Sequence, residues 1–196
     1  MMERFCKKCI SFFVSNNLIK SEYEEVYCYA LNIILSSLIH IATVIVLGWS
    51  FDLLLESLVY YFSFISVRKF AGGGHTDTPL RCYIFSVIST LVVLGLMKLL
   101  FLVNNEVVKL LFEISGFICV IIIAVLAPLD TEAKPLGDKE KRLFKKIAIL
   151  NSFILLTLSA ILMILECNNM GYSIVLAIYM SLFVLLLGKI KNEINL

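Results

Sequence analysis

The sequence predicts an all-α, polytopic membrane protein with about six transmembrane helices and an N-terminal amphipathic segment. Composition is the first observation: 60% of the 196 residues are hydrophobic and 16% are charged, with a mean hydropathy of +0.95. Soluble domains are less apolar and more charged than this. The second observation is that the apolar residues form continuous runs, longer than the alternating segments of a membrane barrel. Because the bilayer offers no water to backbone polar groups, such runs must be helical. We expect one integral-membrane domain over residues 1–196.

The N-terminal segment, residues 1–25, has the pattern of a helix that lies in the membrane interface. Apolar residues recur at near-helical spacing with basic residues beside them: Phe5, Cys9, Ile10, Phe12 and Phe13, with Arg4, Lys7 and Lys8. This combination is typical of interfacial amphipathic helices and makes the lipid bilayer the expected partner of the segment. The net charge of +2 is too small to indicate a nucleic-acid partner.

Six apolar runs follow this segment. We predict spans over residues 26–47, 52–67, 82–103, 110–129, 147–165 and 172–188. The second is the weakest prediction, because it is short and carries Glu56.

Basic and non-basic connections alternate along the chain and predict its orientation. The connection between the second and third spans carries Arg68, Lys69 and Arg81. The connection between the fourth and fifth carries six basic residues: Lys134, Lys139, Lys141, Arg142, Lys145 and Lys146. The connections between the first and second spans and between the fifth and sixth carry none, and the one between the third and fourth carries only Lys109. The positive-inside rule therefore places both basic loops and both termini in the cytoplasm.

The loop between the second and third spans carries the residues suited to chemistry. It contains Gly72-Gly73-Gly74-His75, then Pro79, then Cys82. Pro79 is suited to the first turn of the third span, so Cys82 is expected in or near that turn. A helix N-terminus and nearby arginines favour a thiolate, which is the nucleophilic form, and a histidine can take the thiol proton.

The residues alone leave the role of this loop open. A lone cysteine at a helix start is usually a small apolar residue, and a lone loop histidine is usually solvated. A His75–Cys82 dyad also requires the loop to bend, since seven residues of continuous helix would separate the two by about 10 Å. Asp77 either orients His75 as a third member of the site or caps the loop, and capping is the commoner role.

Other polar residues in the chain have simpler interpretations. Cys6-x-x-Cys9 has the spacing of half a zinc site, but no second pair follows, so no metal or cofactor is expected. His40 and Glu56 lie within predicted spans. His40 is either functional or a neutral histidine bonded to a neighbouring helix, and Glu56 either pairs with a cation from another helix or lies near the interface. The basic loop between the fourth and fifth spans either sets the membrane orientation and contacts anionic lipid, or docks an acidic peptide. Its candidate contacts with a peptide are Lys134, Pro135 and Lys139.

Two motifs stand out in the two basic loops. The first runs from Arg68 through Gly72-Gly73-Gly74-His75 to Cys82, and the second from Ala127-Pro128 to Lys134-Pro135-Leu136. Taken together, they resemble the accessory gene regulator B (AgrB) family of bacterial membrane peptidases in quorum sensing. The order of the motifs, the chain length and the predicted spans also fit, so the resemblance covers essentially the whole chain.

The resemblance implies a cysteine endopeptidase of a Gram-positive cell membrane with His75 and Cys82 as the catalytic pair. The family cleaves a small propeptide, AgrD, near its C-terminal region. Cys82 would form an acyl-enzyme thioester, which a cysteine or serine of the peptide captures to give a cyclic thiolactone or lactone. The tetrahedral oxyanion needs a stabiliser, for which the sequence offers the backbone N–H groups of the glycine run, including Gly73 and Gly74, those at the start of the third span, or Arg68.

A non-enzymatic membrane transporter or scaffold that exports a peptide is the alternative function. Such a protein would tend to show interrupted spans in matching positions of two halves, and the sequence shows none. A homodimer is compatible with either function. The two functions differ at Cys82, which a peptidase requires and a transporter does not.

Overall fold

The structure is a computed structural model that describes residues 2–16, 18, 20–72, 79–103, 105–129 and 137–194. The described residues form seven α-helices and one short 3-10 helix, Ser21–Tyr23. The α-helices are α1 (Met2–Ser15), α2 (Glu24–Ser50), α3 (Leu54–Ala71), α4 (Pro79–Leu102), α5 (Glu106–Leu126), α6 (Asp138–Ile164) and α7 (Asn168–Ile194). The predicted all-α fold class is confirmed.

Contacts divide the chain into two compact units, Met1–Thr43 and Val44–Leu196. The first unit holds α1 and most of α2. In α1, Cys6 and Ile10 are buried, whereas Phe5, Phe12 and Phe13 are exposed. The predicted amphipathic helix is therefore present, with aromatic side chains available to a lipid surface.

Five helices of the described chain are long and apolar enough to cross a membrane. They cover Ser21–Ser50, Arg81–Phe101, Glu106–Leu126, Asp138–Ile164 and Asn168–Lys191. Helix α3, at the position of the predicted second span, is not among them: it has 18 residues and carries Glu56, Arg68 and Lys69. A sixth crossing by α3 stays a prediction.

Helix α6 begins earlier than the sequence suggested. The basic residues from Lys139 to Lys146, which the sequence analysis assigned to a loop, form its first turns. The helix begins here because Lys, Arg, Glu and Leu are good helix formers. In addition, the Glu140 carboxylate accepts a hydrogen bond of 3.2 Å from the N–H of Gly137, the N-cap. Ile147 marks the point where this helix becomes apolar, not the point where it begins.

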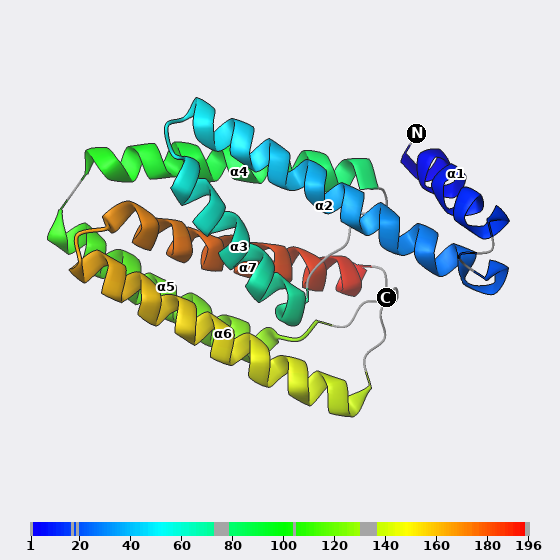
Figure 1. The fold of residues 1–196 in the computed structure, drawn as a ribbon. Coiled ribbons are helices and arrows are strands. Elements are labelled where there is room, and N and C mark those ends of the chain that lie inside the picture. Colours follow the sequence, from blue (N-terminus) through cyan, green and yellow to red (C-terminus); the bar gives the residue numbers. More distant parts are fainter. Residues whose placement is uncertain are drawn as a thin grey trace. The chain divides into compact units, whose positions relative to one another are not determined.

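Helix α7 is the centre of the second unit, where it contacts α3, α4, α5 and α6 (Figure 1). One side of it, including Val175 and Ile178, packs in a cluster with residues of α3, α5 and α6. Another side, including Ala177 and Val184, packs in a second cluster with residues of α3 and α4. A helix that is apolar on all sides can be buried in this way.

Glycines allow the helices around α7 to approach closely. A Cβ atom on Gly116 of α5 would lie 3.0 Å from Leu156 of α6 and 3.1 Å from Val175 of α7. Small residues have this role at helix contacts in membranes, where the lipid removes the hydrophobic drive for association.

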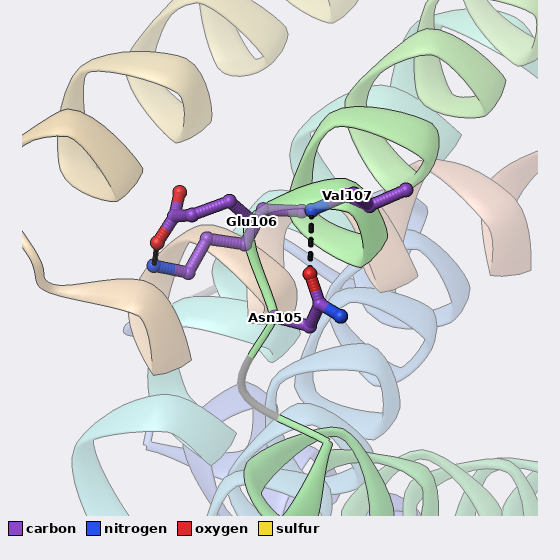
Figure 2. A network of polar contacts seen from close by, with 4 residues as sticks. Asn105, Glu106 and Val107 are labelled. Atoms are coloured by element: carbon purple, nitrogen blue, oxygen red, sulfur yellow. Dashed lines mark hydrogen bonds and ion pairs between the residues drawn. The ribbon is translucent and has the colours of Figure 1, made fainter.

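Polar contacts connect the same helices. Asn151 of α6 donates to the Ser66 hydroxyl of α3 at 3.0 Å, and Ser159 of α6 donates to the Glu113 carboxylate of α5 at 2.7 Å. At the start of α5, Asn105 accepts a hydrogen bond from the N–H of Val107, and Lys109 pairs with Glu106 at 2.6 Å (Figure 2). Such bonds satisfy polar groups that lipid cannot.

Candidate active site

Gly72 ends α3 and begins the glycine-rich loop. Its φ angle is +78°, and its N–H donates to the carbonyl oxygen of Arg68 at 3.0 Å. With a ψ angle of −155°, Gly72 has a backbone geometry that essentially only glycine adopts. The first glycine of the run is therefore required to turn the chain out of the helix.

Gly72 also pairs with the second sequence motif. Gly72 and Leu129 form an isolated parallel β-bridge, and the N–H of Leu129 donates to the carbonyl oxygen of Ala71 at 3.1 Å. A Cβ atom on residue 72 would lie only 2.8 Å from the carbonyl oxygen of Leu129. The loop that leads to Cys82 and the segment that leads to Lys134 therefore start side by side.

Small buried residues make this junction compact. Ala71 is 1% exposed, Ala127 is 3% exposed and Ala148 is fully buried, and the three belong to one cluster. Beside them, the rings of Phe70 and Phe144 meet edge to face, with centroids 5.9 Å apart. We call the contact of Ala71 and Gly72 with Ala127 and Leu129 the loop junction. It brings together the ends of α3 and α5 and the first part of α6.

Arg68 lies in the last turn of α3, one turn before the loop junction. Its guanidinium carbon is 5.7 Å from the centroid of the Phe64 ring, within cation–π range. The contact orients a permanent positive charge next to the start of the glycine-rich loop.

Cys82 is the fourth residue of α4, because the helix begins at Pro79 as the sequence predicted. Its thiol is free and half-buried. Three residues of helical rise place it about 4.5 Å along the axis from Pro79, within the first turn or so.

The other predicted site residues divide into two groups. Lys139 lies in the first turn of α6 and is exposed. Six positions lie outside the described residues: Gly73, Gly74, His75, Asp77, Lys134 and Pro135. The His75–Cys82 dyad, the supporting role of Asp77 and the peptide contacts therefore stay predictions.

Sequence reasoning identified both motifs but missed their direct contact. One feature of the sequence could have indicated this contact. Each motif comes immediately after an apolar run, and the basic loops place the ends of both helices on the same side of the membrane. Loops on one side can meet, but the pairing of residue 72 with residue 129 depends on how α3 and α5 pack.

Comparison with known proteins decides the family. The family model described as Accessory gene regulator B matches residues 6–185. The chain belongs to the AgrB family. Together with the five candidate spans, AgrB membership identifies it as a multi-pass membrane protein.

Similar AgrB proteins occur in several bacteria. An AgrB-like protein of Clostridium perfringens (strain SM101) is 29% identical over 183 residues, which cover 89% of this chain and 83% of that protein. A second AgrB-like protein, from strain 13 of that species, is 27% identical over 83% of this chain and 77% of that protein. The accessory gene regulator protein B of Staphylococcus saprophyticus is 29% identical over 61% of this chain and 62% of its own length. No solved structure shows a significant match.

Proposed function

We propose that this AgrB-family protein is a membrane cysteine endopeptidase that cleaves the C-terminal region of a small AgrD-like propeptide and promotes its cyclisation. The observation that carries the proposal is the family match over residues 6–185, which contains both motifs of the loop junction and Cys82.

The chemistry follows from a thiol nucleophile. In the proposed first step, His75 takes the proton of Cys82 and the sulfur attacks the scissile carbonyl carbon, which gives a tetrahedral oxyanion. The carbon–nitrogen bond then breaks, the departing amine receives the proton from His75, and the propeptide remains on Cys82 as a thioester. A cysteine or serine of the peptide next attacks the thioester carbonyl, which closes the ring and returns the thiol of Cys82.

The loop junction supports this proposal because it fixes the residue from which the chain leaves α3 toward His75 and Cys82. Positioning of a nucleophile and its base is worth several orders of magnitude in rate, and a loop without an anchor would lose much of it. The hydrogen bond from Leu129 to Ala71 and the close contact at Gly72 anchor one end of this loop, and the start of α4 anchors the other.

The basic turns of α6 support a role for the second motif in peptide binding. Lys139, Lys141, Lys145 and Lys146 lie within the first three turns, and α6 follows Leu129 after a short connection. We assign Lys134, Pro135 and Lys139 to contact with the propeptide. We assign the side of the membrane that carries the basic loops to the cytoplasm.

The decisive experiment is co-expression of each Cys82 variant with its propeptide, followed by mass spectrometry of the propeptide. With Cys82→Ala or Cys82→Ser, the C-terminal tail should stay attached to the propeptide, although each variant is present in the membrane at the wild-type level. Cys28→Ser is the matched control, because Cys28 is another half-buried free thiol, in α2, and this variant should process as wild type does. Unchanged processing by both Cys82 variants would refute the peptidase and favour a transporter or scaffold.

A further inference from the structure

Phe64 lies between Arg68 and a second aromatic ring on the same side of α3. Residues 60, 64 and 68 follow one another at intervals of four, so Tyr60, Phe64 and Arg68 are neighbours along one side of the helix. The rings of Tyr60 and Phe64 are stacked, with centroids 6.0 Å apart and an interplanar angle of 12°. The guanidinium carbon of Arg68 lies 5.7 Å from the centroid of the Phe64 ring. We call these three side chains the aromatic ladder; it ends in a permanent positive charge.

Buried packing fixes the rings of the aromatic ladder. Tyr60 is 2% exposed and Phe64 is 8% exposed. Both belong to a buried cluster with residues of α4 and α7, including Val93, Leu94, Met97 and Ala177. Because side chains in a packed core cannot move without disturbing their neighbours, the Phe64 ring offers the guanidinium a fixed surface. The same cluster packs α4, the helix whose first turns hold Cys82.

The guanidinium of Arg68 does not extend past the end of α3. Arginines near the ends of apolar helices usually reach toward water and leave only their aliphatic stem beside apolar surface. Phe64 comes one turn before Arg68, about 6 Å of helical rise, and the guanidinium carbon is still within 5.7 Å of its ring. The positive charge is therefore held beside the last turns of α3. A charge in this place suits an anion that forms against the protein.

The first glycine of the loop is already occupied as a donor. The N–H of Gly72 donates to the carbonyl oxygen of Arg68 at 3.0 Å, which closes the last turn of α3. A backbone N–H has one hydrogen, so this group cannot also donate to a substrate oxygen. The hydrogen bond removes one backbone candidate of the glycine run as an oxyanion stabiliser. The charge of Arg68 lies one turn before this glycine.

We propose that Phe64 is a positioning residue: its ring holds the Arg68 guanidinium where that group stabilises the tetrahedral oxyanion on the scissile carbonyl. This inference rests on the proposed peptidase function, because it assigns the charge to that reaction. A charge that is already oriented needs no rearrangement when the oxyanion forms. An oxyanion forms twice, when Cys82 attacks the propeptide and when the ring closes. Loss of the orientation should therefore slow both steps.

The contact itself can be measured without a substrate. A phenylalanine with one ring fluorine replaces Phe64 in the purified full-length protein, and its fluorine NMR signal is compared with and without Arg68→Gln. We expect the signal to shift when the cation is removed. The same label at Phe62, which is 58% exposed on the same helix, is the matched control and should show no shift. An unchanged signal at position 64 would overturn the proposal.

Graded fluorination of the same ring tests its role in the reaction. Phenylalanines with one, two and three ring fluorines weaken the negative face of the ring step by step, with little change in its shape. For tail release from the propeptide, we expect kcat to fall with each fluorine, by about fivefold with three. KM and thermal stability should stay at their wild-type values, because the lost interaction is made only in the transition state. The same series at Phe62 should leave kcat unchanged.

The outcomes separate this inference from the proposed function. An unchanged kcat across the series at Phe64, in a protein whose Cys82→Ala variant is inactive, would overturn the inference and leave the peptidase intact. A rise in KM at constant kcat would also overturn it, because Arg68 would then act on bound propeptide before the oxyanion forms. A loss of thermal stability at constant kcat would show that the aromatic ladder only stabilises the fold. Tail release by Cys82→Ala would refute the proposed function, and this inference with it, even if the NMR signal shifts.

Discussion

The N–H of Leu129 donates to the carbonyl oxygen of Ala71, so that Leu129 and Gly72 form a parallel bridge between two loops that lie 57 positions apart in the chain (129 − 72). Both loops carry motifs of the AgrB family. The bridge therefore couples the segment before Cys82 to the segment before the basic turns of α6.

Gly72→Ala should destabilise the loop junction. Its new Cβ atom would lie 2.8 Å from the Leu129 carbonyl oxygen, and a φ of +78° is unfavourable for alanine, at a cost of about 1–3 kcal/mol. We expect reduced propeptide processing and easier unfolding in mixed micelles. Gly95→Ala is the matched control, because nothing lies within 4 Å of a Cβ atom at Gly95. If the Gly72 variant is as stable and active as the Gly95 variant, the bridge has no structural role.

The Asn151–Ser66 hydrogen bond should couple α6 to α3. In a double-mutant cycle of Asn151→Ala and Ser66→Ala, we expect a coupling free energy of about 0.6 kcal/mol, the average for such bonds in membranes. Unfolding in mixed micelles measures it, and the Glu113–Ser159 bond between α5 and α6 offers a second cycle. Strictly additive effects of the two substitutions would mean that the bond contributes nothing to folding.

The positive-inside rule predicts that Cys167 faces the outside and Cys82 the cytoplasm. A membrane-impermeant maleimide applied to intact cells should therefore label Cys167, which is exposed, and leave Cys82 unlabelled until the membrane is opened. Cys167→Ser should abolish the labelling of intact cells. Labelling of Cys82 from outside would reverse the proposed orientation.

The proposed cleavage should be reversible in a purified system. Conversion of an amide to a thioester is uphill, so removal of the cut tail is expected to drive the reaction. Excess synthetic tail added to the full-length enzyme and propeptide should lower the equilibrium yield of cyclic product, which mass spectrometry can follow. A tail of the same composition in scrambled order is the control. A yield that does not depend on the added tail would show that another step drives cyclisation.

Local chemistry explains which parts of the structure could be predicted. Helices form where the apolar runs are, because a chain in lipid that does not form a closed barrel must be helical to satisfy its backbone hydrogen bonds. Cys82 lies at a helix start because Pro79 is suited to a first helical turn. The basic first turns of α6 were predicted as a loop because the chain is not apolar there. Lysine and glutamate are nevertheless good helix formers, so the helix begins before the apolar run does.

The sequence by itself determined the helical class, the order of the helices, the amphipathic N-terminal segment and the two motifs. Only the tertiary structure decided that α7 is the central helix, that Gly72 meets Leu129, and that polar residues of α3, of α7 and of the turn between α6 and α7 line one cavity. The physical reason is that lipid tails are as apolar as a protein core. Hydropathy therefore identifies a helix that can enter the membrane but does not distinguish its lipid-facing side from its packed side. That distinction depends on small residues such as Gly116 and on polar pairs such as Asn151 and Ser66, whose partners are known only when the helices are packed.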